Sequence, residues 1–124
     1  MKLLKSMTTS YELSLRLKEL GAVQKLGEYY WVLTDEGEAY CYHHSDSTCN
    51  TSNGYTILCR AFTLGELVRE IKGINVLHLS DRDAWWAFRN IDAWGKSELD
   101  YNNKYTTPEE AAGELYYEIL KSKL

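Results

Sequence analysis

A group of thiols and imidazoles between residues 41 and 59 has the most obvious capacity for chemistry in this chain. Its members are Cys41, His43, His44, Cys49 and Cys59. Zinc requires such ligands to converge tetrahedrally, and their spacing here matches no standard zinc pattern. On a strand, Cys41 and His43 would share one face while His44 would point away. We therefore predict no metal site, and we interpret the thiols as half-buried residues beside surface histidines.

Catalytic groups are equally hard to assemble from the sequence. A cysteine or serine nucleophile would need a nearby base, and no recognisable signature surrounds any of the three histidines. The paired carboxylates have local explanations, because Asp81 and Asp83 fit a turn while Glu109 and Glu110 fit the first turn of a helix. No glycine-rich phosphate loop is present. We predict no catalytic residue and no cofactor.

Two aromatic runs, Tyr29–Trp31 and Trp85–Phe88, are the most distinctive feature of the sequence. Alternate side chains of a strand face opposite sides, so both faces of a sheet would carry aromatic residues. If helices cover only one face, the other presents an aromatic patch, which is typical of interaction surfaces. Burial of both faces, by helices or by a second subunit, is the alternative. Our candidate partner-binding residues are Tyr30, Trp85 and Trp94.

Other functions remain as alternatives. An aromatic pocket between sheet and helices could stack a nucleotide base, with Arg60, Arg82 or Arg89 contacting its phosphate. A self-assembling homo-oligomer or a virion accessory protein is a third interpretation, and an enzyme is the least favoured.

The helices that must position these residues are marked by a repeated Thr-x-x-Glu motif, the capping box, in which the threonine and glutamate side chains satisfy the first free amides. The motif occurs at residues 9–12, 63–66 and 107–110. Gly21 and Gly73 follow the first two helices as left-handed caps would. We predict helices over about residues 9–20, 63–72 and 107–122.

Strand-like runs lie between these helices. We predict strands at about residues 29–33, 39–43, 55–61, 75–79 and 84–90, with a further edge strand at 94–99. Each helix has one apolar stripe and must pack on another element. The predicted fold is therefore α+β, an antiparallel sheet of about five strands with three helices in the order α-β-β-β-α-β-β-(β)-α.

Size and charge limit the function further. A chain of 124 residues predicts a single domain over 1–124, with residues 1–8 as a frayed leader and Met7 as an alternative start. The net charge of −4, with both signs interspersed, disfavours a nucleic-acid partner and leaves a protein partner favoured. No apolar stretch predicts a membrane span, and three cysteines favour a reducing cytoplasm.

Five segments of the sequence form a recognisable series, namely residues 9–14, 17–21, 29–32, 61–67 and 107–112, in that order. Together they resemble a group of small proteins encoded by phages and prophages of gut-type bacteria. The group has no settled activity, so the resemblance implies a genetic context and no site residues. The expected function is a non-catalytic accessory protein that binds a host or phage macromolecule inside the infected bacterium. Counter-defence inhibition, such as blocking a CRISPR effector, is one concrete form.

Overall fold

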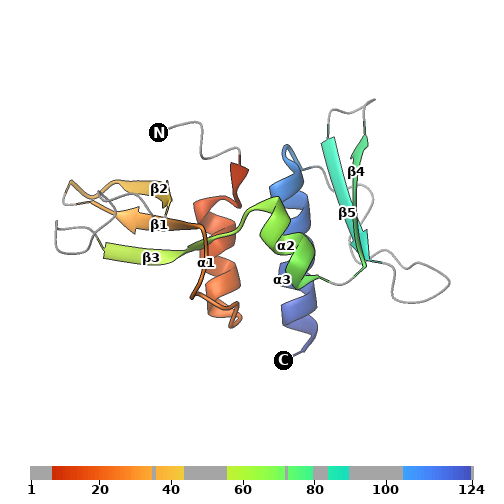
Figure 1. Cartoon of the computed structure of the whole chain (residues 1–124), viewed down its shortest axis with the longest axis horizontal. Helices are drawn as coiled ribbons and strands as arrows, with labels where there is room; N and C mark the ends of the chain where they lie inside the picture. The colour runs from red at the N-terminus through yellow and green to blue at the C-terminus, as the bar shows by residue number, and fades with distance from the viewer. Residues whose placement is uncertain are drawn as a thin grey trace.

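The computed structural model describes residues 7–34, 36–43, 56–71, 73–79, 84–89 and 105–123 (Figure 1). The helices of these residues are α1 (Tyr11–Glu19), α2 (Leu64–Glu70) and α3 (Pro108–Ser122). The strands are β1 (Tyr29–Leu33), β2 (Ala39–His43), β3 (Thr56–Ala61), β4 (Ile74–Leu79) and β5 (Ala84–Arg89). The predicted α+β class and order of elements are confirmed. The expected edge strand at 94–99 lies outside the described residues.

The five strands form two sheets instead of the single predicted sheet. β1 lies between β2 and β3 in one antiparallel sheet, whereas β4 and β5 form a separate antiparallel hairpin. Figure 1 shows the helices between the two sheets, with α1 against β3 and α3 against the hairpin. The division follows from α3, which contacts α1, α2, β4 and β5 and therefore accepts neighbours on several sides.

The main core surrounds α3. Ala111, Ala112 and Leu115 of this helix are fully buried, and they share a cluster with Phe62 and Leu67. A second cluster lies under α1, where Trp31 packs with the two described cysteines and Ala61. Small residues let α1 and α3 approach closely, since a Cβ atom on Gly113 would lie 2.7 Å from Leu13.

The start of α1 differs from the prediction. The N-cap is Ser10, whose hydroxyl accepts from the amide of Leu13, and Thr9 does not cap the helix. Thr9 instead joins α1 to the chain before α2, because its amide donates to the carbonyl of Phe62 and its hydroxyl accepts from the Phe62 amide. Thr8 belongs to the predicted frayed leader, but its side chain is buried.

The other two helix starts follow the predicted motif in whole or in part. Thr63 and Glu66 form a complete capping box at α2. At α3, Thr107 accepts from the amide of Glu110, but the Glu110 carboxylate accepts from Ser10 of α1 instead of returning to Thr107. The glycines predicted to end the first two helices, Gly21 and Gly73, both have the positive φ angle of a left-handed residue.

Candidate protein-binding face

The three-stranded sheet has one face that α1 covers. Trp31 of β1 is directly opposite Cys41 of β2 and Cys59 of β3, so these three side chains share that face. Tyr11 and Leu15 of α1 pack against them, and the Tyr11 and Trp31 rings meet edge to face with centroids 5.8 Å apart. The indole N–H of Trp31 donates to the Thr9 carbonyl. This face of the sheet is therefore occupied by the protein's own core.

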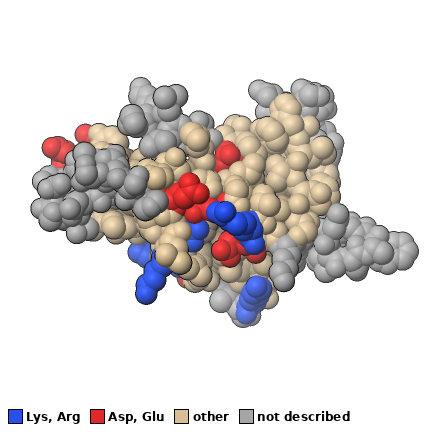
Figure 2. Space-filling view, viewed as in Figure 1, with Lys and Arg blue, Asp and Glu red and all other residues tan. Residues whose placement is uncertain are grey.

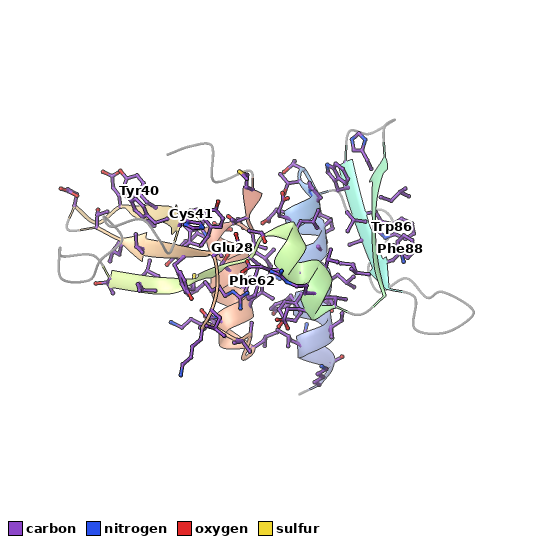
Figure 3. All side chains as sticks on the ribbon, viewed as in Figure 1. Glu28, Tyr40, Cys41, Phe62, Trp86 and Phe88 are labelled. Carbon is purple, nitrogen blue, oxygen red and sulfur yellow. The ribbon has the colours of Figure 1, made fainter. Side chains whose placement is uncertain are left out.

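The opposite face carries three tyrosines, Tyr30, Tyr40 and Tyr42, which we call the tyrosine face. Tyr30 of β1 is directly opposite Tyr42 of β2, and Tyr40 precedes Tyr42 by two residues in β2. Strand alternation therefore places all three rings on the side away from α1. Each is half-buried, and Ile57 of β3, which lies opposite Val32 of β1, is 47% exposed. Figure 3 shows Tyr40 at the end of the sheet remote from the helices.

Local contacts hold the rings of the tyrosine face in place. The Tyr30 hydroxyl accepts from the Gly27 amide at 3.0 Å. The Tyr40 hydroxyl donates to the Glu38 carboxylate at 2.7 Å, and this hydrogen bond raises the pKa of Tyr40 above its ordinary value. The Tyr40 and Tyr42 rings lie with centroids 6.0 Å apart. The Tyr30 and Tyr40 hydroxyls are thus held by defined partners, and these residues combine ring surface with a polar oxygen.

Of the other two aromatic candidates, the structure describes Trp85. Trp85 lies on the inner face of the β4–β5 hairpin, where its amide donates to the Tyr105 carbonyl and its ring lies 4.7 Å from that of His78. Its neighbours Trp86 and Phe88 lie on the side away from α3, as Figure 3 shows, with ring centroids 4.8 Å apart. Trp94 lies outside the described residues.

Arg60 was one of three candidate phosphate ligands in the alternative nucleotide-binding interpretation, and its position gives it a structural role. Its guanidinium is buried, with Nη2 2.9 Å from the Glu66 carboxylate. Nη1 donates to the Val23 carbonyl, and the guanidinium carbon lies 4.3 Å from the Phe62 ring centroid. Buried cations are found with such partners because unpaired burial is costly. Of the other two arginines, Arg82 lies outside the described residues, and of Arg89 only the backbone in β5 is described.

The thiols offer little chemistry in the described part of the chain. Cys41 and Cys59 flank Trp31 on two different neighbouring strands, so roughly two strand spacings, about 10 Å, separate their backbones. A disulfide cannot span that distance. Burial raises the pKa of the Cys59 thiol to about 11, which keeps it protonated and weakly nucleophilic. Among the residues described, no three potential ligands are grouped for a metal, while His44 and Cys49 lie outside them.

The charged surface is mixed. Figure 2 shows acidic and basic side chains next to one another over the middle of the viewed face. Arg16 of α1 and Glu114 of α3 form an ion pair, with two hydrogen bonds near 3 Å. None of the described helices is long and apolar enough to cross a membrane.

Sequence reasoning found Tyr30 but missed Tyr40 and Tyr42. The usable signal was their spacing of two residues in a predicted strand, which places both on one face. What the sequence could not supply was the register that aligns Tyr42 with Tyr30. Comparison with protein-family models, curated proteins and solved structures finds no match for this chain.

Proposed function

We propose that this protein acts without catalysis, by binding another protein through the tyrosine face. The observation that carries the proposal is the placement of Tyr30, Tyr40 and Tyr42 together on the sheet face opposite α1. Tyrosine is enriched at the centre of protein interfaces, because its ring buries a large area while its hydroxyl still forms a hydrogen bond.

The rigidity of the face supports the same function. The three tyrosines stand on paired strands, and two of their hydroxyls already have fixed partners in Gly27 and Glu38. Side chains that are ordered before binding lose less conformational entropy when the complex forms. Such a surface resembles binding sites that use a few rigid aromatic anchors.

The setting of this activity is part of the proposal. The resemblance to small phage and prophage proteins suggests an accessory protein that occupies a surface of a host or phage macromolecule in the infected cell. Steric occupancy requires only shape and a few anchors, and inhibition of a defence effector is a concrete form of it.

Affinity purification from lysate of the bacterial host tests the proposal. The wild-type chain and the Tyr40→Ser/Tyr42→Ser variant serve as baits, and mass spectrometry compares the proteins that each retains. A protein captured by the wild type is then purified and titrated calorimetrically. We expect the double substitution to weaken its binding by at least about tenfold, the effect of losing a hot-spot residue.

The matched control is Glu118→Ser. It changes an exposed residue of α3 that is distant in the sequence from the strands of the tyrosine face. It should bind as the wild type does. Melting curves of each variant establish that the fold persists. A captured protein whose affinity is the same for wild type and double variant would contradict the tyrosine face as its binding site.

A further inference from the structure

The loop between α1 and β1 presents an unusual leucine. Leu26 is 95% exposed, and its φ angle of 66° lies in the left-handed region. Residues other than glycine and asparagine rarely adopt this conformation, because the Cβ atom approaches the backbone. Val23 on the same loop is 57% exposed. We call residues 23–27 the knuckle; Figure 1 shows this loop at the lower end of α1.

The knuckle is held rigidly by residues of the neighbouring strands. Arg60 donates from Nη1 to the Val23 and Lys25 carbonyls, at 3.0 and 3.4 Å, and from its amide to the Gln24 side chain. Gly27 donates to the Tyr30 hydroxyl. A strained residue persists where surrounding contacts determine its conformation, and such residues are concentrated at functional sites. Here the strained residue carries an apolar side chain that is exposed to solvent.

A cavity of about 360 Å³ lies beside the opposite end of α1. Its lining consists of Ser10, Tyr11, Glu12, Trp31 and Ala39. Two of these five residues are aromatic, and the Tyr11 and Trp31 rings stand edge to face. Glu12 is exposed and contributes a negative charge at the rim. The volume lies at the lower end of the range for ligand pockets, roughly 300–1,000 Å³, and exceeds that of a single leucine side chain.

We propose that the knuckle of one copy of this chain occupies the cavity of a second copy. Leu26, with Val23 beside it, provides apolar groups for the aromatic walls. Lys25, exposed next to Leu26, provides the charge opposite to that of Glu12 at the rim. One chain therefore carries the knuckle, a cavity for it, and charges of opposite sign beside each.

The positions of knuckle and cavity favour a two-fold dimer. They flank the two ends of α1, a helix of nine residues and therefore about 14 Å in length. Two copies with antiparallel α1 helices would bring each knuckle to the other copy's cavity. The same contact then forms twice around one axis, and the assembly closes at two chains.

Sedimentation velocity of the full chain over a wide concentration range tests this inference. We expect a species of twice the 14.4 kDa chain mass at high concentration. Leu26→Asn removes the apolar anchor and relieves the strain, so it should weaken dimerisation at least tenfold and raise the melting temperature of the monomer. The control Val68→Asn removes an exposed apolar group from α2 and should leave the dimer intact.

Mixing experiments identify the two sides of the contact. Ala39→Phe fills the cavity and should also give monomers. A mixture of Leu26→Asn and Ala39→Phe chains retains one knuckle and one open cavity, so it should form heterodimers that neither variant forms alone. Glu12→Lys or Lys25→Glu alone should weaken the dimer, and the two changes together should restore it.

The inference is overturned by a chain that stays monomeric at every concentration. It is also overturned by a dimer that Leu26→Asn leaves unchanged, or by variants that fail to associate on mixing although circular dichroism shows both to be folded. None of these substitutions alters a tyrosine of the tyrosine face, so dimerisation and partner binding are tested with different variants.

Discussion

Arg60 shows how one buried side chain organises residues that are distant in the sequence. It connects the carbonyls before β1 with the Glu66 carboxylate of α2, while Glu66 also accepts from the Glu28 and Thr63 amides. Gly27 lies directly against this arginine: a Cβ atom there would come within 2.6 Å of Nε. The absence of a side chain at residue 27 is thus a packing requirement.

A pair of glycine substitutions tests that requirement. Gly27→Ala should destabilise the fold by on the order of 2 kcal/mol, because the arginine or the loop must shift within a packed interior. Gly65→Ala lies in α2, with only the Thr63 hydroxyl nearby at 3.9 Å, and should stabilise by roughly 0.5–1 kcal/mol through helix propensity. Urea unfolding measures both. Equal effects of the two changes on the free energy of unfolding would contradict a packing requirement specific to Gly27.

The type of a residue shows which chemistry its side chain can perform, but it does not show how deeply that side chain is buried. Arg60 reads as a phosphate ligand in the sequence because its charge is evident, but the loop carbonyls that surround it come from residues some 35 positions away. Trp85 and Trp86 illustrate the same limit. Alternation separates their faces, but which face meets α3 depends on a helix that begins at residue 108.

Among the helices, α3 completes the capping of α1. The Glu110 carboxylate accepts from the Ser10 amide at 2.6 Å and from its hydroxyl at 3.2 Å. In an ordinary capping box, the third residue of the same helix would accept from that amide. Here the neighbouring helix supplies the acceptor, so the start of α1 and the start of α3 are fixed together.

Removal of this acceptor should weaken the connection between the two helices and lower the free energy of unfolding. Glu110→Ala leaves the Ser10 amide without its partner in a half-buried position, and we expect a loss of about 1–3 kcal/mol in the free energy of unfolding. Glu114→Ala removes only the Arg16 ion pair, whose arginine side chain is 43% exposed, and should cost less than about 1 kcal/mol. Thermal and urea unfolding compare them; a larger loss for Glu114→Ala would contradict the shared cap.

The first turn of α3 also contains a pH-dependent cost. Glu109 is buried with Oε1 lacking a hydrogen-bond partner, and burial raises the pKa of this carboxyl above 4.5. A raised folded-state pKa means that the protonated form stabilises the fold, and that this contribution is lost as pH rises through the folded pKa. Ionisation of this buried carboxyl at a pH above its folded-state pKa therefore destabilises the fold.

Glu109→Gln should remove the cost of burying an ionised carboxyl at this position. We expect the variant to be more stable than the wild type at neutral pH, by on the order of 1 kcal/mol, with the difference shrinking as the pH falls towards 4.5. Unfolding curves across this pH range measure the difference. A variant that is less stable at neutral pH, or a difference independent of pH, would show that burial of the charge is not the cause.

At the scale of elements the sequence was informative, since helix caps and strand alternation are local signals. The complete box at Thr63 and Glu66 forms as expected. The first box fails because Thr9 has better partners in Phe62 and Ser14, which are contacts that only the folded chain provides. Local motifs thus predict where an element begins to within a residue or two, and tertiary hydrogen bonds decide the final cap.

The whole molecule consists of a helical layer with a sheet on each side (Figure 1). Strand patterns in the sequence could not reveal this division. Both β3 and β4 are apolar strands, and no local sequence signal indicates whether they pair with each other. The division depends on the neighbours of α3, and α2, which packs on α3, carries the chain from one sheet to the other. The tyrosine face and the outer face of the hairpin are therefore remote from each other.

This division predicts two levels of stability. A two-stranded hairpin is marginal by itself and depends on the α3 surface, whereas β1 has a partner on each side and α1 below it. Native-state hydrogen exchange should therefore give lower opening free energies for β4 and β5 amides than for β1 amides. Trp85→Ala removes the inner ring of the hairpin and should accelerate exchange there while β1 remains protected. Equal opening free energies for the two sheets would indicate one cooperative unit, in which the helical layer transmits stability fully from one side to the other.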